Sequence, residues 1–494
     1  MAEAGAASAP TGSGPDAARA LPPNPAGDAF LPFPMGASVP RDFSTIAPHL
    51  PDFVNDRCVG CMACVTACPD AALFAIALPA SDIEGRIDAF ADEADRPALT
   101  AETARARFAS TARFADQPAR HGEMAAAFGL FVDPARCQGC GECVEICAAL
   151  GHDALVRIDK VADEGTGEST LERHQRDLAF LRTLPPTPAA YRNAHILADL
   201  MLGDPTPGPV AGSQSCAGCG AATALRMLSA ATRGSRGTDA LDLVAANACG
   251  LLLGRPEGTD RSPMRVRRVP PDRVATEAAQ VRVRDDRGGR SARSLWVVGG
   301  DGDLASGELL ARLRTLGAAK LVILETGAAP DRAAPALPEL ARMMAAHEDV
   351  YLAQTTPAHL NHCYRAFLDA DAFPGPAVVV VHSACPPAHG IAEDAANRQA
   401  RLAVDARAFP LLTYDPRRGT TTKERLSLHG NPTIGEDWHT LPDGTIVDHL
   451  TFARTERRFA AHLDQDGSPT AELRATMARR SDQWRRLQEM AGIR

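Results

Sequence analysis

Eight cysteines of this chain repeat one spacing, and this repeat constrains the fold more than any other feature. The segment CVGCMACVTACP has a cysteine at every third position, a fourth cysteine after three more residues, and then Pro69. The segment CQGCGECVEIC repeats the spacing, but Ala148 follows it instead of a proline. A loop of this kind can wrap three sulfurs around one centre, so we expect two tight loops. The eight residues are Cys58, Cys61, Cys64, Cys68, Cys137, Cys140, Cys143 and Cys147.

The context of these cysteines favours metal binding over disulfide bonds. The N-terminal residues mix Ala, Pro and Gly with acidic residues and lack the basic start and apolar stretch of a secretion signal. We therefore expect a disordered leader over residues 1–28 and a cytoplasmic protein. Cytosolic thiols stay reduced unless they are catalytic or bind metal, so the 13 cysteines of the 494-residue chain indicate metal sites.

Charge and hydropathy argue against two classes of partner. The formal net charge is −9 and the lysines and arginines are scattered, which is not the pattern of a nucleic-acid-binding protein. The longest apolar runs, such as AVVVVHSAC, are far shorter than the roughly 20 residues that a membrane span needs. We expect neither nucleic acid nor membrane as a partner.

The repeated spacing is that of bacterial ferredoxins with two 4Fe-4S clusters. A cubane needs one thiolate for each iron, and in such ferredoxins the fourth cysteine of each run binds the other cluster. Structural zinc is the alternative, but zinc sites use paired Cys-x-x-Cys knuckles. Proline is not a ligand, so Ala148 alters only the rigidity of the turn. The first predicted ligand set is Cys58, Cys61, Cys64 and Cys147, and the second is Cys137, Cys140, Cys143 and Cys68.

The cysteine runs define a first domain over residues 29–160, which we expect to be an α+β ferredoxin-like domain. The stretch between the runs, roughly 71–130, has helical composition and reads as a helical insertion that covers the clusters. Residues 161–210 contain LPPTPAAY and GDPTPGPVAG, and their Pro and Gly content indicates a linker.

The remainder of the chain has the pattern of a parallel α/β domain over residues 211–400, followed by a C-terminal extension over 401–494. After a predicted helix at 219–231, β-branched segments alternate with helical ones. We expect strands at 242–247, 295–299, 320–325, 350–355 and 377–383.

Four further cysteines could form a third metal site in this α/β domain. Cys216 and Cys219 precede the first helix, and Cys249 and Cys385 follow predicted strands, where open α/β sheets place their ligands. A redox dithiol is the alternative for Cys216 and Cys219, but a Pro- and Gly-rich linker rather than a strand precedes them. Cys363 remains as a buried structural thiol.

At this point the chain resembles the pyruvate:ferredoxin oxidoreductases and related 2-oxoacid:ferredoxin oxidoreductases. The resemblance rests on both ferredoxin runs, CAGCG with its downstream NACG, GGDG and FPGPAVVVVHSACPPAHG. It implies a ferredoxin-like domain followed by a thiamine-diphosphate-type domain whose own 4Fe-4S cluster is bound by four cysteines. By resemblance these ligands are Cys216, Cys219, Cys249 and Cys385.

The same resemblance implies a site for thiamine diphosphate and Mg²⁺. Gly300, Asp301 and Gly302 follow a predicted strand, and a Gly-Asp-Gly turn supplies the oxygen ligands that Mg²⁺ prefers. In the second half of the site, Thr326 is present, but the Asn expected from the family is absent. Asp331 lies at a plausible offset to replace it as a ligand.

The resemblance implies an electron-relaying component with three 4Fe-4S clusters. In the first hypothesis, electrons from thiamine-dependent oxidative decarboxylation of a 2-oxoacid pass through the clusters to ferredoxin or flavodoxin. A partner subunit must then supply the missing catalytic domains. In the second hypothesis, the chain is a thiamine-independent electron carrier for another reductase, and the α/β domain is a scaffold.

Overall fold

The computed structural model describes the two cysteine loops and most of the C-terminal half in detail. The described residues from Asp42 onward belong to one compact unit. They are 42–91, 101–160, 169–193, 195–202, 216–236, 241–245, 264–268, 276–278, 280, 294–300, 320–325 and 349–494.

Two small antiparallel sheets form the N-terminal region. Strand β1 (His49–Phe53) pairs with β5 (Leu155–Asp159), so the segments on either side of the cysteine runs are joined. The second sheet has the order β2-β4-β3. Its strands are β2 (Leu73–Pro79), β3 (Phe108–Ala109) and β4 (Ala126–Val132).

The β2-β4-β3 sheet separates two apolar cores. Because side chains alternate along a strand, Ala75 and Ala77 of β2 face the core that contains the buried cysteines, whereas Ile76 and Leu78 face the other core. Both sides of the sheet are therefore packed. Helices α2 (Ala80–Ala91) and α6 (Thr170–Leu181) contribute to the core away from the cysteines.

Two predicted boundaries of this region differ from the structure. The expected helical insertion at 71–130 begins and ends in strands. The helices that the structure describes within it are α2, α3 (Ala101–Arg105), a π-helix (Ala112–Asp116) and α4 (Gln117–Arg120). The expected linker at 161–210 contains helix α6, which starts with a capping box between Ser169 and Glu172 and buries Phe180. A short helix, α7 (Leu197–Leu200), follows it.

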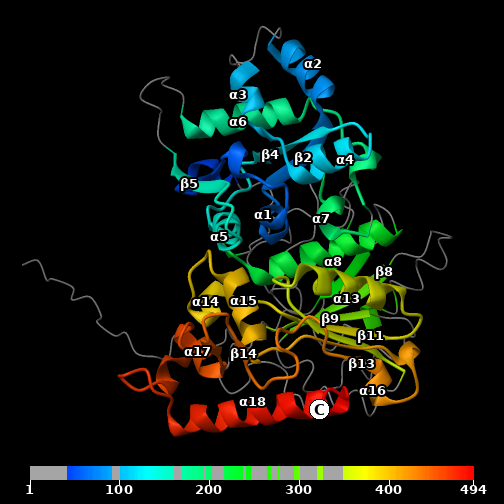
Figure 1. The fold of residues 1–494 in the computed structure, drawn as a ribbon, viewed down its shortest axis with the longest axis vertical. Coiled ribbons are helices and arrows are strands. Elements are labelled where there is room, and N and C mark those ends of the chain that lie inside the picture. Colours follow the sequence, from blue (N-terminus) through cyan, green and yellow to red (C-terminus); the bar gives the residue numbers. More distant parts are fainter. Residues whose placement is uncertain are drawn as a thin grey trace, which may run out of the picture. The chain divides into compact units, whose positions relative to one another are not determined.

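An eight-stranded sheet forms the C-terminal region, in the order β13-β12-β10-β11-β9-β8-β6-β7 (Figure 1). The strands from β10 to β7 are parallel, as the sequence predicts, and β12 and β13 add an antiparallel edge. The parallel strands are β6 (Leu241–Ala245), β7 (Met264–Arg268), β8 (Ser294–Gly299), β9 (Lys320–Glu325), β10 (Tyr351–Thr355) and β11 (Ala377–His382).

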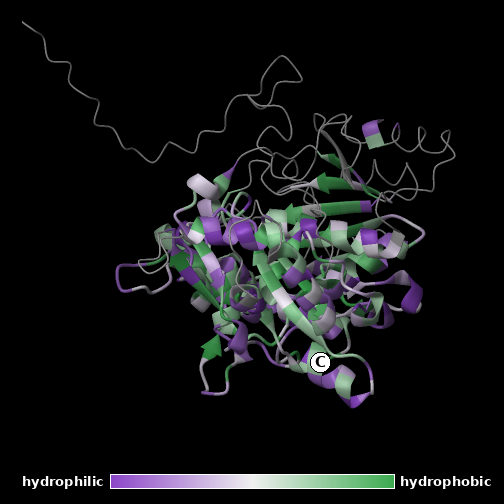
Figure 2. Ribbon diagram, turned by 90° about the horizontal axis from the view of Figure 1, so that it is seen from above, coloured by the Kyte–Doolittle hydropathy of each residue, from purple (hydrophilic) through white to green (hydrophobic). Residues whose placement is uncertain are grey.

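Two long helices and the C-terminal residues cover the sheet. Helix α8 (Gly220–Arg236) packs against α13 (Leu360–Ala372), and α13 lies on β10 and β11. Figure 2 shows that the strands are mostly hydrophobic, as expected for strands buried on both faces. The predicted boundary at residue 400 falls inside helix α15 (Ala396–Asp405), and β12 (Leu412–Tyr414) and β13 (Leu426–Ser427) still belong to the sheet.

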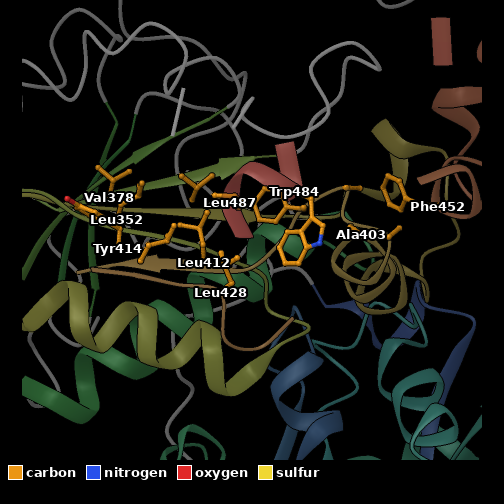
Figure 3. Packing of buried hydrophobic residues seen from close by; sticks show 14 of the residues in the cluster. Leu352, Val378, Ala403, Leu412, Tyr414, Leu428, Phe452, Trp484 and Leu487 are labelled. Carbon is orange, nitrogen blue, oxygen red and sulfur yellow. The ribbon is translucent and has the colours of Figure 1, made fainter. Parts of the chain in front are cut away.

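The last helix, α18 (Ala471–Met490), docks one apolar stripe on this core. Trp484 and Leu487 are fully buried near Leu412 and Leu428 (Figure 3). The indole N–H of Trp484 donates to the carbonyl oxygen of Glu436 at 2.7 Å, which satisfies its polar group. The remaining short helices and strands are α14 (Pro386–His389), α16 (Thr422–Arg425), α17 (His449–Ala453), β14 (His439–Thr440) and β15 (Ile446–Val447).

Short stretches of 3₁₀-helix connect several of these elements. They are Phe43–Thr45, Asn55–Arg57, Ala189–Tyr191, Pro416–Arg418 and Arg457–His462. None of the helices that the structure describes has the length and apolar character needed to cross a membrane.

Candidate iron–sulfur sites

Each cysteine run forms a loop that leads into a short helix. The first loop leads into α1 (Ala63–Ala67) and the second into α5 (Glu142–Ala149), and these two helices pack together. The residue before each helix has a left-handed backbone, with φ of 66° at Met62 and 90° at Gly141. Glycine adopts this conformation at no steric cost, whereas Met62 is held there at some cost.

The packing of α1 on α5 divides the cysteines into two groups. Four of them, Cys68, Cys137, Cys140 and Cys143, line one cavity. In the other group, Cys61 and Cys147 lie near both Cys58 and Cys64 and contribute to raising the pKa of those two thiols. Each group thus combines three cysteines of one loop with the fourth cysteine of the other run. This grouping is the one expected from the spacing, and the presence of iron stays a prediction.

Backbone N–H groups point at the sulfurs of both groups. Gly60 N–H lies 3.4 Å from the Sγ of Cys58, and Ala72 N–H lies 3.4 Å from the Sγ of Cys68. Ala154 N–H lies 3.2 Å from the Sγ of Cys147. Such donors stabilise negative charge on sulfur, and their number is one of the properties that set a cluster's reduction potential.

The thiols are buried where a free thiolate would be unfavourable. Burial, aided by neighbouring cysteines, raises the pKa of Cys58 to about 11 and that of Cys137 to about 12. Iron ligands must be thiolates, so these positions suit sulfur whose charge is shared with a metal cluster. Within the described ranges, no three His, Cys, Asp or Glu side chains are grouped so that they could hold a single metal ion.

The structure brings three of the four cysteines predicted for the third site into neighbouring loops. Cys216 and Cys219 form a turn immediately before α8, in which the Cys219 N–H donates to the Cys216 carbonyl oxygen at 3.2 Å. The next N–H, that of Gly220, donates to the carbonyl oxygen of Ala384 at 3.1 Å, beside Cys385. Cys249, the fourth predicted ligand, lies outside the described residues.

Glycine is required where these two loops meet. Gly218 has φ +70°, and a Cβ at this position would overlap the carbonyl oxygen of Glu393. A Cβ on Gly220 would approach the carbonyl oxygen of Ala384 to 2.6 Å. The CAGCG sequence can therefore lie against the segments on both sides of Cys385 only because both positions lack a side chain.

Of the residues predicted for the diphosphate site, the structure describes only Gly300. Gly300 directly follows β8, and β8 pairs with β9 in parallel, so both strands end at the same edge of the sheet. Asp301, Gly302, Thr326 and Asp331 lie outside the described residues, and their role as ligands stays a prediction.

The structure adds charged residues around the cysteines that the sequence analysis did not identify. Arg226 of α8 donates to the backbone of the first cysteine run, at the carbonyl oxygens of Val65 and Cys68. Glu142 accepts the N–H of Asn397 at 3.2 Å, at the start of α15. Burial raises the pKa of Glu142 to about 7. The sequence signal for Arg226 is an arginine within the apolar first part of α8, GAATALRML, seven residues after Cys219.

Parts of the chain are similar to known proteins. Residues 51–148 match the family model of the 4Fe-4S dicluster domain. The probable pyruvate-flavodoxin oxidoreductase of Escherichia coli (strain K12) is 27% identical over 186 residues, which are 33% of this chain and 15% of that protein. Among solved structures, the 2-oxoglutarate:ferredoxin oxidoreductase of Magnetococcus marinus is 18% identical with a TM-score of 0.25, over 35% of this chain and 64% of that chain.

The sequence matches support a general assignment. The chain contains a 4Fe-4S dicluster domain and has weak, partial similarity to an oxidoreductase of the family that the motifs resemble. It spans only a small part of that relative's length. Together these findings support an iron–sulfur protein with an oxidoreductase-type role.

The contact at Gly218 yields a prediction with a matched control. Gly122 has the same φ of +70°, but a Cβ added there would meet nothing within 4 Å. Gly122→Ala should therefore cost only the left-handed backbone strain, about 1–2 kcal/mol. Gly218→Ala should cost about 1–3 kcal/mol more because it also separates two packed loops. Denaturant unfolding of both variants measures the difference, and equal losses of stability would contradict the close contact.

Proposed function

We propose that this chain is the electron-relaying component of a 2-oxoacid:ferredoxin-type oxidoreductase. It would hold three 4Fe-4S clusters, two in the ferredoxin-like region and one at the edge of the α/β region. The observation that supports this most strongly is the crossed grouping of eight cysteines around α1 and α5, together with the match to a dicluster domain.

The residues of the first two sites fit such clusters in three ways. Each group offers four sulfurs, as a cubane requires. Backbone N–H groups of Gly60, Ala72 and Ala154 point at sulfur. Cys68, Cys143 and Cys147 are buried, which limits the access of water to the inner side of both sites. When bound, 4Fe-4S clusters accept and release single electrons, and the chain's own residues fix their positions and surroundings.

The third site connects the α/β region with the ferredoxin-like region. Helix α8 starts at the Cys216–Cys219 turn, and its first two turns contact the first cysteine run through Thr223 and Arg226. Electrons that reach a cluster at this turn would thus arrive next to the cluster bound by Cys68. A partner subunit would supply the catalytic domains that this chain lacks, and ferredoxin or flavodoxin would receive the electrons.

The number of clusters can be tested with two cysteine variants. Cys363 is also a cysteine of the α/β region, but it is fully buried within α13 and belongs to no predicted ligand set. The anaerobically prepared wild-type chain should contain about twelve irons. Cys385→Ser should lower the content by about four irons, whereas Cys363→Ser should leave it unchanged. A wild-type content near eight irons, unaffected by Cys385→Ser, would contradict the third cluster.

Thiamine diphosphate binding separates the two functional hypotheses. If the α/β region retains the diphosphate site, calorimetry with thiamine diphosphate and Mg²⁺ should show saturable binding that Asp301→Ala abolishes. The absent Asn and the Ala- and Pro-rich segment after Thr326 favour the alternative, a thiamine-independent electron carrier. A full iron content without cofactor binding would support that carrier and rule out thiamine chemistry in this chain.

A further inference from the structure

Arg226 is a positive charge buried at the cysteine run. Its side chain arises from the apolar helix α8, and only 6% of the residue is exposed. One guanidinium nitrogen donates to the carbonyl oxygen of Val65 at 3.1 Å and to that of Cys68, and the other contacts the sulfur of Met201 at 3.9 Å. Burying a cation is costly unless opposite charge lies near it, so its surroundings are informative.

Two side chains of the first cysteine run lie near Arg226. Burial lowers the pKa of the Arg226 guanidinium, and the nearby side chains of Cys68 and Asp70 oppose that shift. Asp70 is itself buried, with 2% exposed, and accepts a hydrogen bond from the side chain of Gln138 at 2.6 Å. Gln138 belongs to the second cysteine run, so both buried charges contact the loops that line the same cavity.

Both charges contact the loops of one ligand group. Arg226 donates to the carbonyl oxygen of Cys68. Asp70 lines the cavity together with Cys68, Cys137, Cys140 and Cys143. The two charges are therefore placed at the cavity of this group.

We propose that the two buried charges of opposite sign, Arg226 and Asp70, together set the reduction potential of the cluster bound at this cavity, and this inference rests on the proposed function. Reduction adds one negative charge to a cluster. A buried positive charge stabilises that state and raises the potential, whereas a buried carboxylate lowers it. Arg226 is in addition a positioning residue, because its guanidinium holds the backbone of the Cys68 turn.

Arg157 provides a matched control for the charge. Its guanidinium lies 3.4 Å from the carbonyl oxygen of Cys140, a cysteine of the same group. Unlike Arg226, its side chain is 41% exposed and forms an ion pair with Asp394 at 3.1 Å. Exposed and paired charges are screened by water, so Arg157 should affect the potential much less.

Thr223 provides a matched control for the hydrogen bonds that Arg226 donates to the backbone of the first cysteine run. Its hydroxyl donates to the carbonyl oxygen of Ala67 at 3.4 Å, from the same face of α8 to the same turn as Arg226. Thr223→Val removes this contact without changing any charge. A purely structural effect of α8 on the turn should therefore appear in Thr223→Val as well as in variants of Arg226.

The test is a redox titration of the full-length, cluster-loaded chain, followed by EPR spectroscopy. Arg226→Gln should lower the midpoint potential of one cluster by at least about 59 mV, which is a tenfold change in the equilibrium constant of a one-electron couple. Asp70→Asn should raise the midpoint potential of the same cluster. Arg226→Lys should stay near the wild-type potential because it keeps the charge. Arg157→Gln and Thr223→Val should change the midpoint potential of each cluster by no more than a small fraction of that amount.

Unchanged potentials in fully loaded Arg226→Gln would overturn the proposal, as would equal shifts in Arg226→Gln and Thr223→Val. If Arg226→Gln does not assemble clusters, Asp70→Asn decides. A rise in the midpoint potential of one cluster supports the role of the two buried charges, and no rise refutes it. Failure of the proposed function is distinguishable, because the wild-type chain would then contain no iron and give no EPR signal on reduction.

Discussion

The packing of α1 against α5 is the contact on which the rest of the cysteine region depends. Each loop can present only three sulfurs to one centre, so a fourth must come from the helix of the other run. The strand pair β1–β5 and the sheet containing β2 and β4 hold the two cysteine runs next to each other, so that α1 and α5 can pack together.

Helix α8 extends this arrangement into the α/β region. It begins at a cysteine turn that packs against the segments on both sides of Cys385 through Gly218 and Gly220. It then contacts the first cysteine run through Thr223 and Arg226. One helix thus touches the candidate ligands of two sites. A relay of single electrons requires this kind of proximity, since sites on separate, unconnected surfaces could not exchange electrons rapidly.

Much of this arrangement could be predicted from the sequence because the signals were local. The cysteine spacing predicted the grouping around α1 and α5, and apolar, β-branched runs predicted five of the six parallel strands. Strand β7 was missed because its sequence, MRVRR, alternates arginine with apolar residues and lacks the continuous apolar run of its neighbours. Helix α6 was missed because prolines on its C-terminal side made the whole segment resemble a linker.

The features that could not be predicted depend on contacts distant in sequence. Arg226 looks like a surface residue in the sequence, and its burial follows only from the carbonyl oxygens of Val65 and Cys68, some 160 positions earlier. The contact of Glu142 with the start of α15 likewise joins residues from different regions. Both are polar groups next to cysteine ligands, where small changes in charge and hydrogen bonding have the largest effect on redox properties.

The central claim is that this chain stores and passes electrons through its cysteine-bound clusters. An anaerobic reductive titration, in which electrons are counted by coulometry while the visible absorption of the clusters is followed, tests it most directly. The account predicts uptake of about three electrons per chain, one for each cluster. An iron-loaded chain that takes up no electrons in the potential range of ferredoxins would contradict the account.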